Sequence, residues 1–378
     1  MYIYRLVQKN IEEKLFGGRI LVLYGARRTG KTSIVKNILQ KYPENSFYFD
    51  FEDPQNRLLF ENAGVEKLKS LLQDYKLVIF DEAQKFLNIG QTLKLIHDHL
   101  PSVQVIATGS SSFELSNKIN EPLTGRKWEF KLFPLSIEEI KQAKNSIYVA
   151  QNLQEFLVYG TYPSLFDKSN AEKKDILTEL SSSYLFQDVF TYQDIRNPEV
   201  LEKLLRLLAF QVWNEVSYHE LALNLKINEE TVARYIQLLE KAFVIFRLSA
   251  FSKNPRKEIG KTRKIYFYDL GIRNSLISSF NNLETRNDIG ALWENFCVVE
   301  RMKNNEYSQK FVNTYFWRSY SGQEIDYIEE SGEELKTFEF KYNSNKKGKI
   351  PSSFATSYPN HTFEVVNTDN FSNFILPN

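Results

Sequence analysis

Over the first 140 residues, short apolar runs alternate with segments whose apolar residues recur at helical spacing. A short apolar run between turn-forming residues is typical of a buried strand, and apolar positions three or four apart predict an amphipathic helix. Helices are expected over 32–39 and around Leu68. The predicted strands are 19–24, 46–51, 76–82, 103–110 and 128–132. This alternation predicts an α/β domain with a parallel sheet.

The remainder of the chain shows three further patterns. Residues 137–206 are mostly helical, residues 216–268 hold two short helices and a strand pair, and the C-terminal part holds a helix and several strands. A chain of 378 residues exceeds one ordinary hydrophobic core, so several domains are expected. The expected domains are 1–140, 141–206, 207–282 and 283–378.

The segment 25–32 reads GARRTGKT and fits the phosphate-loop pattern G-x-x-x-x-G-K-[ST] without a mismatch. Its glycines let backbone N–H groups wrap a polyphosphate, and the helix that follows points the positive end of its dipole at the same anion. Lys31 is expected to reach the β and γ oxygens, and Thr32 to ligate magnesium. The sequence therefore predicts ATP binding. The residues expected at the nucleotide are Gly25, Ala26, Arg27, Arg28, Thr29, Gly30, Lys31, Thr32, Ser33 and Thr108.

Two acids end the predicted strand 76–82 and form a Walker B motif. Asp81 is expected to hold the magnesium, and Glu82 to polarise the attacking water as catalytic base. The alternative is a pair of acids that only caps a strand. Thr108 and Ser110, after a later strand, are candidates for sensing the γ-phosphate or for a simple turn.

Arg126 is the candidate arginine finger, acting in its own or a neighbouring subunit. The second version implies homo-oligomers. Arg27 and Arg28 compete for the role, and a surface ion pair is the alternative for all three arginines.

Residues 216–268 predict a winged helix-turn-helix. Helices are expected from Ser217 and over 229–239, with a turn over 225–228, and the strands 244–248 and 264–268 follow. The loop between these strands carries the basic residues Lys253, Arg256, Lys257, Lys261 and Arg263. Basic groups on phosphates would give DNA affinity through counterion release. Winged helices also serve as protein-docking modules, and both partners remain open.

A second group of charged residues lies near the C-terminus. Glu294 is on a helix, Asp326 on a strand after a glycine turn, and Glu339 with Lys341 on the next strand, an order that resembles restriction-endonuclease-like nucleases. Glu294, Asp326 and Glu339 are the expected ligands of magnesium or manganese, and Lys341 is the expected activator of the attacking water. The alternative is a solvated strand face with alternating charges.

Composition adds few constraints. The 48 Lys and Arg balance 47 Asp and Glu, so contact with nucleic acid must come from local patches. The single cysteine, Cys297, lies in an apolar run and fits a reducing compartment. We expect a cytoplasmic protein without a membrane partner, because no run has the length of a membrane span.

These motifs together resemble prokaryotic AAA-type ATPases that carry a C-terminal winged-helix and restriction-endonuclease-like region. The resemblance implies an additional-strand P-loop ATPase fold, with ATP and magnesium bound at Lys31, Thr32 and Asp81. It also proposes the nuclease-like centre described above. Thr161 and Phe340 depart from the family pattern, and neither is a proposed ligand.

Two functions follow from this resemblance. In the first, the ATPase gates or drives a magnesium-dependent nuclease that acts on DNA, in keeping with defence against foreign DNA. In the second, a nucleotide switch controls binding of DNA or protein by a non-catalytic C-terminal domain. A transcription regulator is a third alternative, but it leaves the C-terminal acids unexplained.

Overall fold

Six consecutive buried residues, Ile20–Gly25, form β1, the strand that leads into the glycine-rich loop. The computed structural model describes residues 2–110, 112–184, 197–252, 263–319 and 321–376. The chain forms two compact units. Unit 1 comprises residues 1–135 and 241–243, and unit 2 comprises residues 136–240 and 244–378.

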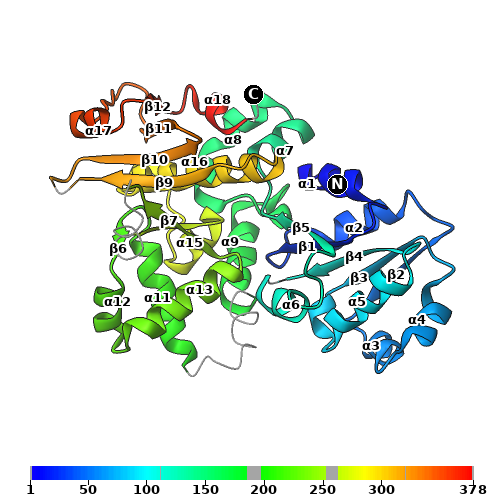
Figure 1. Ribbon diagram of the computed structural model, residues 1–378. Coiled ribbons are helices and arrows are strands. Elements are labelled where there is room, and N and C mark those ends of the chain that lie inside the picture. The colour runs from blue at the N-terminus through cyan, green and yellow to red at the C-terminus, as the bar shows by residue number, and fades with distance from the viewer. Residues whose placement is uncertain (1, 111, 185–196, 253–262, 320, 377–378) are drawn as a thin grey trace. The chain divides into compact units, whose positions relative to one another are not determined.

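Unit 1 is an α/β layer structure around one sheet (Figure 1). Its strands are β1, β2 (Ser46–Asp50), β3 (Leu77–Asp81), β4 (Gln104–Gly109) and β5 (Lys127–Leu132). Its helices are α1 (Leu6–Lys14), α2 (Lys31–Leu39), α3 (Pro54–Phe60), α4 (Val65–Leu72), the short η1 (Ala83–Lys85), α5 (Ile89–His99) and α6 (Ser112–Ile119).

The sheet of unit 1 has the order β2-β3-β4-β1-β5, and every pair is parallel. Strand β4 therefore lies between the strand that enters the loop and the strand that ends in Asp81. The predicted parallel sheet is confirmed. Because parallel strands end at one edge, Gly25, Asp81 and Gly109 lie at the same edge of the sheet.

Unit 2 begins with helices and ends with a sheet. Its helical elements are α7 (Ile137–Ala143), α8 (Ser146–Tyr159), η2 (Pro163–Leu165), α9 (Asn170–Glu179), η3 (Leu180–Tyr184), α11 (Pro198–Phe210), α12 (Tyr218–Leu225), α13 (Glu229–Lys241), α15 (Leu270–Leu276), η4 (Leu283–Thr285), α16 (Ile289–Tyr307), α17 (Ser352–Ser357) and α18 (Phe371–Ile375). Its strands are β6 (Glu215–Val216), β7 (Ile245–Ala250), β8 (Arg263–Phe267), β9 (Asn313–Arg318), β10 (Glu324–Ser331), β11 (Glu334–Phe340) and β12 (His361–Val366).

One sheet of order β12-β11-β10-β9-β7-β8-β6 runs through unit 2 (Figure 1). The strand pair β7–β8 follows the two helices α12 and α13, as predicted for the winged helix-turn-helix segment. β7 also pairs in parallel with β9, where Ser249 faces Tyr315. The strand pair and the C-terminal strands therefore form one hydrogen-bonded sheet, and the predicted division at 283 stays a prediction.

Helix α16 packs against this sheet with its aromatic side chains. Trp293 is fully buried, and its ring lies 5.7 Å from that of Phe296 and 5.6 Å from that of Phe371 on α18. Phe374 of α18 contacts the ring of Phe338 on β11 at 4.7 Å. The C-terminal helix therefore holds α16 against the strands, and Glu294 is fixed beside Trp293.

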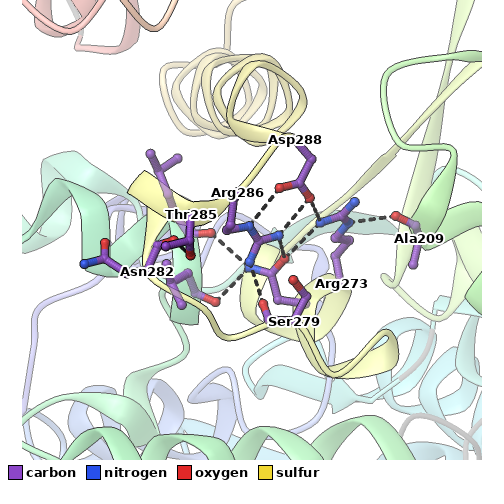
Figure 2. A network of polar contacts seen from close by, with 10 residues as sticks. Ala209, Arg273, Ser279, Asn282, Thr285, Arg286 and Asp288 are labelled. Atoms are coloured by element: carbon purple, nitrogen blue, oxygen red, sulfur yellow. Dashed lines mark hydrogen bonds and ion pairs between the residues drawn. The ribbon is translucent and has the colours of Figure 1, made fainter.

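A half-buried ionic network joins α11, α15 and the start of α16 (Figure 2). Asp288 accepts from Arg273 at 2.6 Å and from Arg286 at 2.8 Å, and Arg273 also donates to the carbonyl of Ala209. Burial favours the neutral carboxyl, but the hydrogen bonds from Arg286 and Arg273 lower the pKa of Asp288 to about 2. The network is therefore charged at neutral pH and links three helices of unit 2.

Candidate functional site

The loop between β1 and α2 has the backbone that a phosphate cradle needs. Gly30 has a φ of +103° and caps α2, a conformation that favours glycine. At Gly25 a Cβ atom would lie 2.3 Å from the carbonyl oxygen of Leu132 on β5, so only glycine fits there. Thr29 fastens the loop through its hydroxyl, which donates to the carbonyl of Ala26 at 2.7 Å.

The ammonium of Lys31 lies inside this loop. It donates to the carbonyl oxygens of Gly25 at 2.8 Å and Ala26 at 3.1 Å, and the residue is 5% exposed. Ser33 follows in the first turn of α2. A buried cation at a helix N-terminus, among backbone N–H groups, is an anion-binding arrangement.

Asp81 is the acceptor at the centre of the site. The hydroxyl of Thr32 donates to its Oδ2 at 2.7 Å, Tyr48 donates to the same oxygen, and Thr108 donates to Oδ1. Burial and the bond to Asp81 raise the pKa of the Tyr48 phenol. The structure thus brings together Thr32, Asp81 and Thr108, as the sequence predicts, and adds Tyr48.

The oxygens of Thr32 and Asp81 fit the magnesium ion that this arrangement implies. They are hard donors at adjacent positions, and three hydroxyls donate hydrogen bonds to the Asp81 carboxylate. A divalent ion bound there would add positive charge beside that carboxylate.

Glu82 stands next to Asp81 in a left-handed conformation, with a φ of +50°. Such a conformation is costly for a residue with a side chain and is concentrated at functional positions. Burial raises the pKa of Glu82, while the charge of Lys31 opposes that rise. A carboxylate with a raised pKa is better suited to accept a proton from water.

Gln84 is a residue of this site to which the sequence analysis gave no role. It is 2% exposed, and its Nε2 donates both to Glu82 and, at 3.1 Å, to the hydroxyl of Ser110. Its Oε1 is buried and has no hydrogen-bond partner among the described residues. Gln84 therefore links the expected base to the end of β4. The signal in the sequence was its position two residues after Glu82.

Arg126 lies at the wrong edge of the sheet to serve its own loop. Its carbonyl accepts from the N–H of Ile20, at the start of β1, whereas the loop follows Gly25 at the end of β1. A strand of this length separates the two by about 15–20 Å. Its guanidinium pairs with Asp98 at 2.9 Å, which matches the surface ion pair left open above. This placement favours the surface ion pair, and the arginine-finger role of Arg126, in its own or a neighbouring subunit, stays a prediction.

Arg27 and Arg28 both lie in the loop, and Arg28 has a φ of +60°. Burial raises the pKa of Glu82, and the charge of Arg27 opposes that rise, which places Arg27 electrostatically near the expected base.

Of the four predicted residues of the nuclease-like centre, Glu294 lies on α16, Asp326 on β10 and Glu339 on β11, and Lys341 directly follows β11. Glu294 is 4% exposed, Asp326 accepts from the N–H of Phe340 at 2.8 Å, and Lys341 pairs with Glu339 at 2.7 Å. Burial and the charge of Glu294 raise the pKa of Asp326 to about 7. Within the described ranges, no three His, Cys, Asp or Glu side chains form a group that could hold a metal ion.

The basic loop predicted as a wing lies largely outside the described residues. Lys253, Arg256, Lys257 and Lys261 fall in that gap. Arg263 lies on β8, and its guanidinium donates to the hydroxyl of Tyr218 at 3.0 Å. Among the helices that the structure describes, none is long and apolar enough to span a bilayer.

Comparison with protein families gives three matches. Residues 17–141 match a family described as an AAA domain. Residues 150–283 and 289–374 match two families described as domains of unknown function, DUF8612 and DUF4143. The first match and the loop geometry support an AAA-type P-loop ATPase.

Comparison with whole proteins adds relatives without an assigned role. An uncharacterized protein of Methanocaldococcus jannaschii is 28% identical over 366 residues, which cover 91% of this chain and 79% of the relative. An uncharacterized protein of Haemophilus influenzae is 26% identical over 278 residues, which cover 68% of this chain and 69% of the relative.

Among solved structures, a Walker-type ATPase of Pyrococcus abyssi is 17% identical, with a TM-score of 0.49, and the match covers 73% of this chain and 96% of that one. The RuvB Holliday junction branch migration motor of Thermotoga maritima is 16% identical, with a TM-score of 0.31, and the match covers 65% and 90% of the two chains. These values carry no functional conclusion.

Proposed function

We propose that unit 1 binds ATP with magnesium and hydrolyses it. The observation that carries this proposal is the convergence of Lys31, Thr32, Asp81 and Glu82 at one edge of a parallel sheet. The AAA domain match over residues 17–141 supports it.

The residues divide the work of phosphoryl transfer. Lys31 exchanges its two loop carbonyls for phosphate oxygens, and the N–H groups at the start of α2 face the same anion. Thr32 and Asp81 would hold the metal ion, which offsets the charge that develops on the phosphates. Glu82 accepts the proton of the attacking water, and Gln84 fixes the orientation of that carboxylate.

The test of this proposal separates binding from hydrolysis. Lys31→Ala is expected to weaken ATP binding, and Glu82→Gln is expected to bind ATP and to stop hydrolysis. Phosphate release and binding of a fluorescent ATP analogue measure the two steps. Hydrolysis that survives in both variants would overturn the proposal.

We further propose that unit 2 acts on DNA under the control of the nucleotide. The two helices α12 and α13 with the pair β7–β8 have the order of a winged helix-turn-helix. In the first version of this function the acids at Glu294, Asp326 and Glu339 form a nuclease centre with Lys341. In the second version, unit 2 binds DNA or a protein and cleaves nothing.

One observation favours the second version. The three acids do not form a group that could hold a metal ion, as far as the described residues show. Cleavage assays on linear, circular and single-stranded DNA, in magnesium or manganese and with or without ATP, distinguish the two versions. Cleavage that is lost in Lys341→Ala would establish the nuclease. ATP hydrolysis without cleavage would leave the nucleotide-controlled binding protein.

A further inference from the structure

A buried lysine outside the C-terminal strands contacts the acidic centre of unit 2, the group formed by Glu294, Asp326 and Glu339. Lys264, on β8, is 1% exposed, and its Nζ donates to Oε1 of Glu294 at 2.8 Å. The same ammonium also pairs with Glu324, at the start of β10. The hydroxyl of Tyr266 donates to the same Glu294 oxygen at 2.7 Å. One cation therefore serves two carboxylates inside the unit.

The side chain of Lys264 is placed by the continuous sheet. Strands β7 and β9 separate β8 from β10, and the ammonium lies 5.5 Å from the ring centre of Phe316 on β9. Aliphatic stems of lysine pack on apolar surfaces while the charged end finds a partner. Helix α16 packs on β8 and places Glu294 beside Lys264, and the pairing of β7 with β9 brings Glu324 of β10 within reach of the same ammonium.

The other two acids of the centre are also engaged. Asp326 accepts the N–H of Phe340 at 2.8 Å, and Glu339 pairs with Lys341 at 2.7 Å. The second oxygen of Glu339 faces Gly348, where a Cβ atom would lie 2.1 Å away. One carboxylate oxygen of Glu339 therefore pairs with Lys341, and the other lies against the backbone at Gly348.

We propose that Lys264 is the resident cation of this centre and occupies the electrostatic place of a divalent metal ion. The inference rests on the second version of the function proposed for unit 2, in which that unit cleaves nothing. Magnesium requires about six oxygen ligands near 2.1 Å in octahedral geometry. Here Glu294 accepts from the Lys264 ammonium at 2.8 Å, Asp326 accepts from the N–H of Phe340, and Glu339 pairs with Lys341. Carboxylates engaged in this way do not form an octahedral magnesium shell.

Lys264 remains charged in this setting. The ammonium is paired with both Glu294 and Glu324, and an opposite charge within about 4–6 Å favours the charged form. Removal of one partner from a buried ion pair leaves an uncompensated charge, which is strongly destabilising. Lys264 is therefore required for unit 2 to be stable unless another cation replaces it.

The first experiment counts metal ions on the full chain. Manganese binding is titrated by electron paramagnetic resonance for the wild type and for Asp326→Asn, so that any metal ion at unit 1 contributes equally to both. We expect the same number of bound ions in the two proteins. A manganese ion present in the wild type and lost in Asp326→Asn would overturn the proposal. This comparison leaves Lys264 intact.

The second experiment replaces the cation. Lys264→Met keeps the apolar stem and leaves Glu294 and Glu324 without their ammonium, so the thermal midpoint of unit 2 is expected to fall by about 5–10 °C. Manganese should restore part of that loss in Lys264→Met and leave the midpoint of the wild type unchanged. A loss in Lys264→Met that manganese does not reduce, or a midpoint equal to that of the wild type, would count against the proposal.

A double variant controls for lost packing. Lys264→Met combined with Glu294→Gln removes one buried charge of each sign, and it should recover a large part of the lost stability. No recovery would show that Lys264 acts through packing alone and would overturn the proposal. ATP hydrolysis is measured on the same samples. A failure of ATP hydrolysis in the wild type would contradict the function proposed for unit 1 and leave the assignment of Lys264 standing.

Discussion

Asp81 in unit 1 is surrounded by neutral hydroxyls, whereas Glu294 in unit 2 shares the ammonium of Lys264. Hydroxyl groups donate hydrogen bonds but leave a net charge, and a net charge in a buried place attracts a metal ion. An internal ammonium removes that attraction and stabilises the fold instead. The two centres thus differ in the hydrogen-bond donors of their carboxylates, which are hydroxyls at Asp81 and a lysine ammonium with a phenol at Glu294.

The largest expected effect is in unit 1. Glu82→Gln should lower the rate of ATP hydrolysis by about 10²–10⁴-fold, because a general base is lost while its shape stays. Steady-state phosphate release measures the loss. The matched control is Glu66→Gln, whose side chain is 88% exposed on α4 and should leave the rate unchanged. An unchanged rate in Glu82→Gln would show that Glu82 is not the catalytic base.

In unit 2, the Asp288 carboxylate is also paired with cations, and Asp288→Asn should cost stability and spare hydrolysis. It breaks the half-buried network with Arg273 and Arg286, and we expect unit 2 to lose about 2 kcal/mol, less than for a fully buried pair. Urea unfolding at neutral pH measures the loss, and the exposed Asp175→Asn is the control. A variant as stable as the wild type would show that the arginines find other partners.

The same network predicts a pH dependence. The folded-state pKa of Asp288, about 2, lies below its ordinary value of 3.8. Its contribution to stability is therefore complete above about pH 4 and is lost as the pH falls through 2. The difference between wild type and Asp288→Asn in urea should shrink over that range. A difference that stays constant down to pH 2 would contradict this assignment.

A smaller effect is expected at Gln84. Gln84→Ala should lower kcat about tenfold with a smaller change in KM, because it frees the carboxylate of Glu82 without touching the phosphates. The lost hydrogen bond also raises the pKa of Glu82, so the acid limb of the pH–rate profile should move to higher pH. Gln84→Glu is isosteric and lacks the donor, so it should not restore the rate. Restoration by Gln84→Glu would show that only volume matters.

The smallest effect is expected at Arg126. Its pair with Asp98 lies on the surface, and the loop of its own chain is out of reach, so Arg126→Ala should leave the rate unchanged in dilute solution. If it serves a neighbouring chain, the specific activity of the wild type rises with protein concentration and that of Arg126→Ala does not. A constant specific activity in the wild type would exclude the neighbouring-subunit role.

Unit 1 was predictable because its signals are local. The loop 25–32 needs glycines at fixed positions, and Asp81 follows an apolar strand, so both are visible in a short stretch of sequence. The parallel sheet follows from the alternation of strands and helices. The orientation of Gln84 was not predictable, because it depends on β4 arriving beside β3.

Unit 2 was predictable only in its elements. Helices α12 and α13 begin and end within a few residues of the predicted positions, since capping and apolar spacing are local. The contacts of Lys264 with Glu294 and Glu324 were not visible, because they depend on α16 packing on β8 and on the pairing of β7 with β9, and sequence spacing does not encode which elements become neighbours. The acids were identified, but their partner was not.

The pairing of β7 with β9 also has a mechanical consequence. A cut between residues 283 and 289, where two family matches meet, would leave β7 and β9 each with an unpaired edge. Unpaired edges recruit other strands and promote aggregation. Fragments made at that boundary should therefore be insoluble. Within the intact chain, a displacement of the β7–β8 pair is transmitted to the C-terminal strands through the backbone hydrogen bonds between β7 and β9. We therefore expect these two segments to move together.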